Sequence, residues 1–490
     1  MLTVKYKSLN NISKDLSIII IGRVLQIIIM LVSLRLLTTF LTPEEVGNYY
    51  IILALVAFFN LVLLNPSSMY FSRHLLQWQR SKNLLNALSV FILWIVIVAI
   101  ASIPISIFVY GWLGYATKFD LDLFLIYIFT AILIGTIHRN VMYGTNTLGY
   151  RKEFVMYLIS TLLIGLICSV SIIYLYHSLA LSWLMGIILS EALMLHLIFK
   201  FFIQKNKLNI QKIKITLNKD RVQKILIFSL PIALTTFLMW GQNTAYRLLV
   251  DYQYSGEVLG YIGIGLGISG SIFASIEAIS MQYFNPIFLK NILDSSKKKR
   301  TEAWNSMAKQ IVPIYILASF FTIAMSEVLI SIVASEKFHD SYVYIMFGVV
   351  IEFFRVMTNL LNNVSQSEYK TTETIKPYLV GFVISLGLLS NIDFGTNYFM
   401  IPLVLGLSYF LVFIYMYSNM KKMLDIKYDV NILKTILFSL PFLMVYFINV
   451  TDINLVLNLL VVSTFGLYFL FVVWLFHHQS VRTNTTYERE

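Results

Sequence analysis

The feature that most constrains this chain is a series of long apolar stretches that recurs along its whole length. A helix needs about 20 mostly apolar residues to cross about 30 Å of hydrocarbon. Fourteen stretches reach or approach this length, and the eleventh and thirteenth are the shortest: 16–41, 46–65, 86–110, 121–143, 154–176, 180–200, 225–250, 259–284, 310–333, 342–364, 378–394, 398–418, 435–450 and 454–476. The first is too long for a signal-peptide core, so we interpret it as a retained span. The sequence predicts an all-α polytopic membrane protein with about 14 transmembrane helices.

The charged residues predict the orientation of these helices. Lys and Arg number 37 against 25 Asp and Glu, a net charge of +12, although only 13% of residues are charged. With a cytoplasmic N-terminus, 30 basic residues fall in cytoplasmic segments, five in spans and only Lys118 and Lys337 outside. This asymmetry follows the positive-inside rule and predicts that both termini are cytoplasmic. The net charge is then +19 inside, −8 outside and +1 in the spans, so the basicity reports orientation and contact with anionic lipid, not a nucleic-acid partner.

An internal repeat divides the predicted spans into two halves. A shift of 212 residues aligns Arg35-Leu36-Leu37 with Arg247-Leu248-Leu249, and it also aligns Glu45, Val46 and Tyr49 with Glu257, Val258 and Tyr261. These are six identities in fifteen positions, and Gly47 and Gly260 follow with an offset of one. A six-span unit used twice explains the spacing, and because six is even the two lobes share an orientation.

The repeat predicts two six-helix lobes related by a pseudo-twofold axis, with two extra C-terminal helices. The expected segments are an N-terminal lobe (1–204), a basic cytoplasmic linker (205–224), a C-terminal lobe (225–420), two additional helices (421–476) and a cytoplasmic tail (477–490). The loops expected outside are all short, which leaves no room there for a catalytic domain.

The few ionisable residues within the spans are the candidates for function, because a charge near the bilayer centre is costly and normally faces a protein interior or a water-filled path. Away from the extreme ends of the spans, they are Arg23, Arg35, Arg139, Arg247, Arg355, Glu191, Glu277, Glu327 and Glu352. All the cations are arginines, whose guanidinium stays charged and offers a planar fork to phosphate.

The arginines allow more than one interpretation. Arg23 lies about 10 Å into the first span at 1.5 Å per residue, where it either snorkels to the interface or lines a central cavity. Arg35 and Arg247 lie near the outer ends of equivalent spans, where they either anchor the helices or face each other across the pseudo-twofold axis. Arg139 is expected to be an inner anchor. Asn243 adds a donor that suits sugar hydroxyls or a contact between helices.

The carboxylates are the candidates for ion coupling. Glu352 and Arg355 are three residues apart and can pair on one helix face, either permanently or until a substrate or proton opens the pair. Glu191 and Glu277 have no basic residue within a turn of their own helix, so each needs a partner from another helix or a raised pKa. The sequence has no P-loop for ATP and no Cys or His pattern for a metal, and it predicts no cofactor.

The first-span stretch Gly22-Arg23 through Arg35-Leu36-Leu37, the turn Leu41–Tyr49 after it, and the counterpart Phe228–Pro231 through Arg247 to Tyr261 resemble one family. It is the polysaccharide transporter family, the O-antigen and capsule repeat-unit flippases of the multidrug/oligosaccharidyl-lipid/polysaccharide exporter superfamily. The resemblance covers the whole chain in span count and layout but only about 60 residues in motif detail.

The resemblance implies a flippase of the bacterial inner membrane that moves an undecaprenyl-diphosphate-linked oligosaccharide to the outer leaflet by alternating access. It implies substrate binding by Arg23, Arg35 and Arg247, with Asn243 and Arg355 as further candidates. Ion coupling is assigned to Glu191, Glu277 or Glu352. The implied partners are the lipid-linked substrate, membrane lipids, and the polysaccharide polymerase and chain-length machinery.

Two other functions remain open from the sequence. A cation-coupled multidrug antiporter of the same superfamily has a similar layout, although its cavity is usually acidic. A membrane-embedded polymerase or O-acyltransferase is the third; a polymerase normally carries a large external loop, and an acyltransferase needs an activated histidine, for which His138 and His196 are the span candidates.

Overall fold

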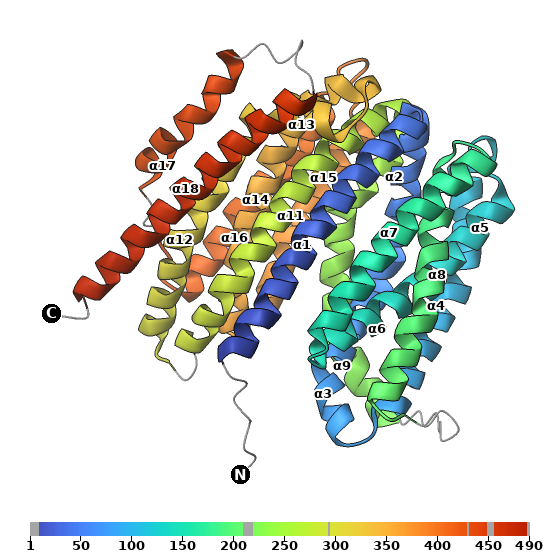
Figure 1. The fold of residues 1–490 in the computed structure, drawn as a ribbon, viewed down its shortest axis with the longest axis horizontal. Coiled ribbons are helices and arrows are strands. Elements are labelled where there is room, and N and C mark those ends of the chain that lie inside the picture. Colours follow the sequence, from blue (N-terminus) through green and yellow to red (C-terminus); the bar gives the residue numbers. More distant parts are fainter. Residues whose placement is uncertain (1–8, 209–218, 293–294, 429–430, 448–454, 488–490) are drawn as a thin grey trace. The chain divides into compact units, whose positions relative to one another are not determined.

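The computed structural model describes residues 9–208, 219–292, 295–428, 431–447 and 455–487. Every regular element in these ranges is helical (Figure 1). The chain forms two compact units, Met1–Trp240 and Gly241–Glu490, called here the first and second unit. Their boundary lies inside the stretch expected as the seventh span.

Thirteen helices of the described residues are long and apolar enough to cross a membrane, against the fourteen stretches expected. The remaining stretch, expected at 435–450, forms a shorter apolar element, Ile432–Phe447. It consists of eight residues of α-helix and eight of 3₁₀ helix. Because a 3₁₀ helix rises about 2.0 Å per residue and an α-helix about 1.5 Å, this element is about 28 Å long, close to the thickness of the hydrocarbon.

The helices of the first unit correspond to the first six predicted spans and the start of the seventh. Its elements are α1 (Leu9–Phe40), α2 (Pro43–Phe58), η1 (Phe59–Leu64), α3 (Asn65–Arg80), α4 (Leu84–Trp112), η2 (Tyr115–Thr117), α5 (Leu121–Thr130), η3 (Ala131–Gly135), α6 (Thr136–Thr147), α7 (Arg151–Leu175), α8 (Ala180–Lys205) and α9 (Lys219–Trp240). Helix α7 packs between α1 and α8, as Figure 1 shows.

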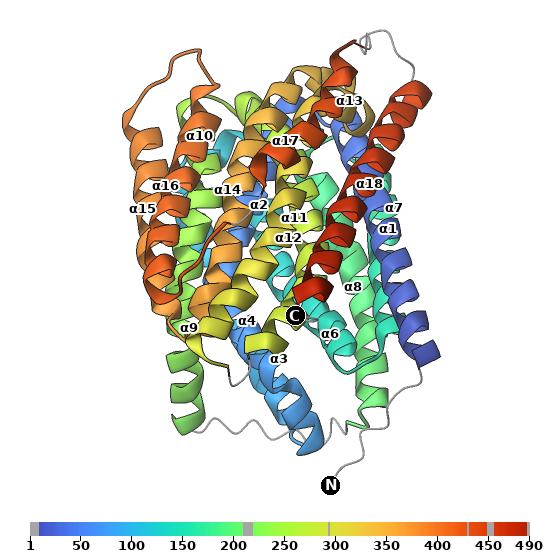
Figure 2. The ribbon, with the colours of Figure 1, turned by 90° about the vertical axis from the view of Figure 1, so that its left-hand side faces the viewer.

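The second unit contains the remaining helices. They are η5 (Gly241–Ala245), α10 (Tyr246–Gln253), α11 (Gly256–Ile292), α12 (Lys297–Ala324), α13 (Ser326–Val333), η6 (Glu336–Ser341), α14 (Tyr342–Ser367), η7 (Thr371–Thr374), α15 (Ile375–Asn391), α16 (Met400–Met423), α17 (Ile432–Ser439), η8 (Leu440–Phe447) and α18 (Leu455–Tyr487). Helix α14 packs against α11, α12 and α16, and α15 lies beside α16 (Figure 2). The last two predicted spans, α17 with η8 and α18, pack on α12 through Phe442, Val445 and Val472.

The turn of the predicted repeat has the same construction in both units. In the first, Thr42 accepts a hydrogen bond from Glu45 N and caps α2, which begins with Pro43. In the second, the hydroxyl of Ser255 accepts from Val258 N at the start of α11. A hydroxyl at the N-cap satisfies one of the free N–H groups of the first turn. The two caps are offset by one residue from the ungapped alignment, and the same offset relates Gly47 to Gly260.

Two expected spans differ from the structure. The second does not end at residue 65: it continues through η1 and α3 to Arg80, because Phe71 and Leu75, four residues apart, are buried on one face of an otherwise polar helix. The ninth ends at Ala324, and Glu327 lies in the first turn of the separate helix α13, where a negative charge is favourable.

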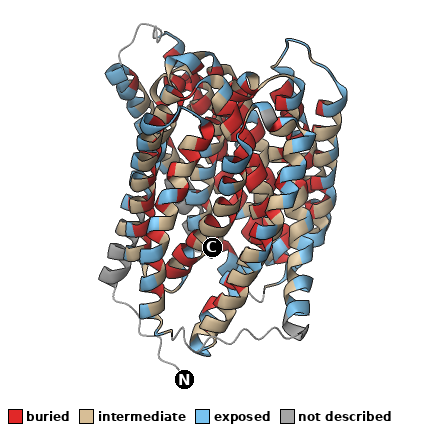
Figure 3. Ribbon diagram, turned by 90° about the vertical axis from the view of Figure 1, so that its right-hand side faces the viewer, coloured by how far each residue is buried: buried red, intermediate tan, exposed pale blue. Residues whose placement is uncertain are grey.

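Three π-helical segments interrupt long helices among the described residues: η1, η3 and η5. Such segments leave the regular hydrogen-bond ladder and often occur at functional sites. Buried and exposed residues alternate around many helices, as Figure 3 shows, which is the pattern of helices packed on one side.

Candidate functional site

The second unit brings three of the predicted residues together in one ion network. Arg355 on α14 donates from Nε to Glu352 Oε2 at 2.6 Å, the pair expected within one helix. Its Nη1 also donates to Glu277 Oε2 on α11 at 3.0 Å. The partner that Glu277 needed from another helix is therefore Arg355.

Asn359 completes this network, although it is not among the residues predicted from the sequence. Its Nδ2 donates to Glu277 Oε1 at 2.8 Å. Asn359 follows Arg355 by four residues, so the two side chains lie on the same face of α14. This i, i+4 spacing beside an intramembrane arginine is the signal that would have found it.

The network carries two carboxylates against one guanidinium. Its side chains are mostly but not fully buried, at 18% exposed for Glu277, 15% for Glu352 and 21% for Arg355. A group of this composition has one negative charge in excess when both carboxylates are ionised. Binding one proton or one monovalent cation would neutralise it, which is the chemistry of a coupling site.

Glu191 lies in the interior of the first unit, beside the π-helical segment η3. A Cβ placed on Gly135 would come within 2.7 Å of Glu191 Oε2, so the glycine leaves room for this carboxylate. Arg139, four residues after Gly135, interacts electrostatically with Glu191. Glu191 therefore has a cationic neighbour on another helix, which was one of the two alternatives that the sequence left open.

Arg139 is part of this interior cluster and does not act only as the inner membrane anchor that we expected. Its Nη2 donates to Asn60 Oδ1 at 2.9 Å, and the Thr136 hydroxyl donates to the same oxygen at 3.0 Å. Asn60 lies in η1, and Thr136 and Arg139 lie in α6, so these bonds join the π-helical segment η1 to α6. Sequence reasoning missed Asn60 because a lone amide in an apolar stretch carries no pattern.

The two arginines of α1 occupy different environments. Gly22 packs closely on Val155 of α7, so the next residue, Arg23, points away from that contact and is exposed, with its Nη1 donating to Gln26 Oε1 at 2.9 Å. Arg35 is half-buried near the end of the helix, and the hydroxyls of Thr38 and Thr39 donate to its backbone carbonyl. Their roles in substrate binding stay predictions.

Arg247 and Asn243 lie at the π-helical segment η5 and the start of α10. Both are half-buried, and the Arg247 guanidinium lies 5.9 Å from the Tyr246 ring centroid. The Oδ1 atom of Asn243 is buried and makes no hydrogen bond within the described part of the chain. The adjacent Gln242, by contrast, donates to Ser408 Oγ of α16 at 2.8 Å and serves as a contact between helices. Asn243 thus retains an acceptor without a partner in the described part of the chain, and its role in substrate binding stays a prediction.

The histidines considered for an acyltransferase occupy different environments. His138 is buried, and its Nε2 lies 3.2 Å from the hydroxyl of Thr161, whereas His196 is exposed on α8. Among the residues that the structure describes, no group of three or more His, Cys, Asp and Glu has the arrangement of a metal site.

Comparisons with known proteins identify a family and a similar fold for this chain. A family model described as "Polysaccharide biosynthesis protein" matches residues 36–343, well over half of the chain. No curated protein matches the sequence. Among solved structures, "Lipid II flippase MurJ, inward closed conformation" is similar with a TM-score of 0.63 and 14% identity, covering 95% of this chain and 99% of that one.

Two multidrug transporter structures are also similar. An inward-facing multidrug resistance MATE family transporter of the MOP superfamily has a TM-score of 0.60 and 12% identity, covering 81% of this chain and 95% of that one. The eukaryotic MATE transporter AtDTX14 has a TM-score of 0.52 and 12% identity, covering 88% and 98%. At these identities the likeness shows the fold alone, which is that of MATE and MurJ transporters.

Proposed function

Because the chain belongs to the polysaccharide biosynthesis protein family, we propose that it is a flippase for a lipid-linked oligosaccharide. The substrate is an undecaprenyl-diphosphate-linked repeat unit of O-antigen or another surface polysaccharide. The protein lies in the bacterial cytoplasmic membrane with both termini in the cytoplasm, and it moves the substrate from the inner to the outer leaflet by alternating access. The family match carries this proposal, and the similarity to the fold of a lipid II flippase supports it.

The physical problem of this reaction is the diphosphate, since a charged group crosses hydrocarbon only at a prohibitive cost. Arg23, Arg35 and Arg247 supply permanent cations along the spans, and Arg can hold phosphate with two parallel hydrogen bonds. Asn243 supplies an acceptor for a sugar hydroxyl. The polyprenyl tail stays in the lipid during transport.

The ion network of the second unit is our proposed coupling site. Glu277 and Glu352 share Arg355, so protonation of one carboxylate makes the network neutral and frees a donor of Arg355. Arg355 then becomes available to the substrate. One residue would thus serve both ion coupling, through its carboxylate partners, and substrate binding. Glu191, beside Arg139 in the first unit, is the second candidate for coupling.

The experiment that tests the proposal is deletion of the gene followed by complementation. We expect the lipid-linked unit to accumulate in the inner leaflet and the surface polysaccharide to disappear. Wild type and the exposed control Arg80→Gln should restore both, whereas Arg23→Gln or Arg247→Gln should lower transport by about tenfold or more, the loss of one charge-assisted hydrogen bond. Normal surface polysaccharide in a verified deletion strain would refute the flippase.

A multidrug antiporter is the second candidate, because the MATE transporters have the same fold. It predicts that overexpression lowers the accumulation of cationic drugs in cells. Drug accumulation that is unchanged by overexpression, together with a loss of surface polysaccharide on deletion, separates the two functions.

A further inference from the structure

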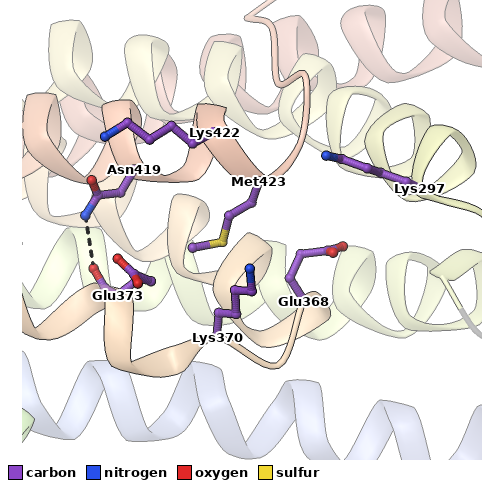
Figure 4. A pocket seen from close by; sticks show the side chains of 7 residues that line it. All are labelled: Lys297, Glu368, Lys370, Glu373, Asn419, Lys422 and Met423. Carbon is purple, nitrogen blue, oxygen red and sulfur yellow. Dashed lines mark hydrogen bonds between the residues drawn. The ribbon is translucent and has the colours of Figure 1, made fainter.

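A polar cavity of about 290 Å³ lies within the second unit, at the end that carries the basic loops. It is lined by Lys297 at the start of α12, by Glu368 and Lys370 directly after α14, by Glu373 of η7, and by Asn419 and Lys422 in the last turns of α16. Figure 4 shows Lys370 between the two glutamates and Lys297 extending toward the same space from α12. Three lysines from three different segments thus line one cavity, and Figure 4 shows the Lys422 amine directed away from Lys297 and Lys370.

The walls of this cavity are tied together by specific bonds. Arg300 of α12 forms a two-pronged ion pair with Glu368, with Nε–Oε1 at 2.6 Å and Nη2–Oε2 at 3.1 Å. Asn419 of α16 donates to the backbone oxygen of Glu373 at 3.3 Å. Asn305 of α12 accepts from Lys427 N at 2.9 Å, which fixes the segment that follows α16. The cavity is therefore a built feature of the helix ends and not a chance gap between loose loops.

The charge balance of the cavity favours an anion. Arg300 neutralises Glu368 through both carboxylate oxygens, so Glu373 is the one remaining carboxylate on the wall. Lys297, Lys370 and Lys422 then leave an excess of two positive charges. All three lysines are exposed and present their amines to a ligand from the solvent or from the lipid surface.

The position of the cavity favours a lipid. Lys422 is in the last turn of α16, whose apolar stretch is one of the membrane-spanning candidates, Met400–Met423. The end of such a span lies at the depth of the lipid headgroups. Basic pockets between transmembrane helices on the cytoplasmic side bind phosphorylated headgroups.

We propose that this cavity binds the phosphate group of an anionic phospholipid from the leaflet that faces the basic loops. Lys297 and Lys370 hold the phosphate, Lys422 adds positive charge to the wall, and the ion pair of Arg300 with Glu368 keeps the ends of α12 and α14 in place around it. The bound lipid joins the ends of α12, α14, η7 and α16. Its lining residues are not among those that we propose for transport, so the proposal does not depend on the identity of the transported substrate.

The test compares two triple variants that remove the same charge. Lys297→Gln/Lys370→Gln/Lys422→Gln neutralises the cavity, and Lys298→Gln/Lys299→Gln/Lys421→Gln neutralises neighbouring lysines that do not line it. Purified full-length protein in neutral detergent is titrated with short-chain phosphatidylglycerol, short-chain phosphatidylcholine and inorganic phosphate. Binding is measured by calorimetry, and thermal unfolding without lipid checks that each variant is folded.

We expect wild type and the control triple to bind phosphatidylglycerol with similar affinity and the cavity triple to bind at least about tenfold more weakly, since only the cavity triple lacks the lysine charges that line the cavity. The single variant Lys370→Gln, at the centre of the cavity, should show a smaller loss in the same direction. Equal weakening in both triples would mean general surface attraction and would overturn the proposal. Equal binding of phosphatidylcholine, or inorganic phosphate binding as tightly as the lipid, would overturn it as well.

Discussion

The role that we propose for Arg355 depends on its contacts with residues of two helices. Within α14 it forms the expected pair with Glu352, but the structure adds Glu277 from α11 as a second carboxylate and Asn359 as a further donor. A pair would be electrically neutral, whereas this network is not. The difference between an inert ion pair and a candidate coupling site therefore depends on one contact between two helices.

This network makes a prediction about stability. Arg355→Gln leaves two carboxylates together without a cation, and removal of one partner from a largely buried ion pair costs about 3 kcal/mol. We expect a clear loss of stability when the purified variant is unfolded by heat or denaturant in detergent.

The control is the triple variant Glu277→Gln/Glu352→Gln/Arg355→Gln, which keeps hydrogen-bonding groups of similar shape without charge. It should recover most of the lost stability, because no carboxylate is left unpaired. If Arg355→Gln were as stable as this triple variant, the two carboxylates would not share the guanidinium in the way described.

At the scale of elements, close helix packing is what positions the candidate residues. Gly186 of α8 faces the backbone of Ser169 on α7, and a Cβ there would lie 2.3 Å from both the N and the Cα of Ser169. Ser169 also donates to Trp183 O of α8 at 2.7 Å. Because Glu191 follows Gly186 on α8, this contact with α7 helps to fix where the carboxylate lies.

A pair of glycine substitutions tests this packing. Gly186→Ala forces a methyl group against a neighbouring backbone, and overpacking of this kind costs about 1–3 kcal/mol. Gly387→Ala on α15 adds the same methyl group where no atom lies within 4 Å, so it should be neutral or stabilise by up to about 1 kcal/mol through helix propensity. The measurement is thermal unfolding of both variants. If Gly186→Ala were as stable as Gly387→Ala, α7 and α8 would not be in close contact at Gly186.

For the whole molecule, the family match and the fold confirm the resemblance seen in the sequence and the expectation of an all-α, multi-pass membrane protein. The protein has the fold of MATE and MurJ transporters, with 13 candidate spans and one shorter apolar element among the described residues. The lobe boundaries at 204 and 225, and the cytoplasmic position of both termini, stay predictions.

The orientation can be tested with single cysteines, because Cys168 is the one cysteine of the chain. In a Cys168→Ser background, Lys118→Cys between α4 and α5 should react with a membrane-impermeant maleimide in intact cells. Ser81→Cys, directly after α3, should react only after the membrane is permeabilised. If Ser81→Cys were labelled and Lys118→Cys protected in intact cells, the predicted topology would be wrong and the opposite orientation would hold.

The all-α, membrane-spanning architecture can be predicted from the sequence alone. The length of an apolar stretch and the Lys and Arg residues beside it are properties of a single segment, and they govern whether and how that segment inserts into a membrane. The sequence also identified the pair Glu352 and Arg355, whose spacing lies within one helix. Hydropathy did not find the polar helix α3, since its burial rests on contacts with α4, α6 and α9.

Contacts between residues far apart in the chain depend on how the helices pack. Glu277 and Arg355 are 78 positions apart, and Asn60 and Arg139 are 79 positions apart. No periodicity within a helix encodes such contacts, because they depend on which faces of two helices pack together. The lysine-lined cavity has the same origin: its residues look like separate orientation signals along the chain, and folding of the second unit brings them to one place.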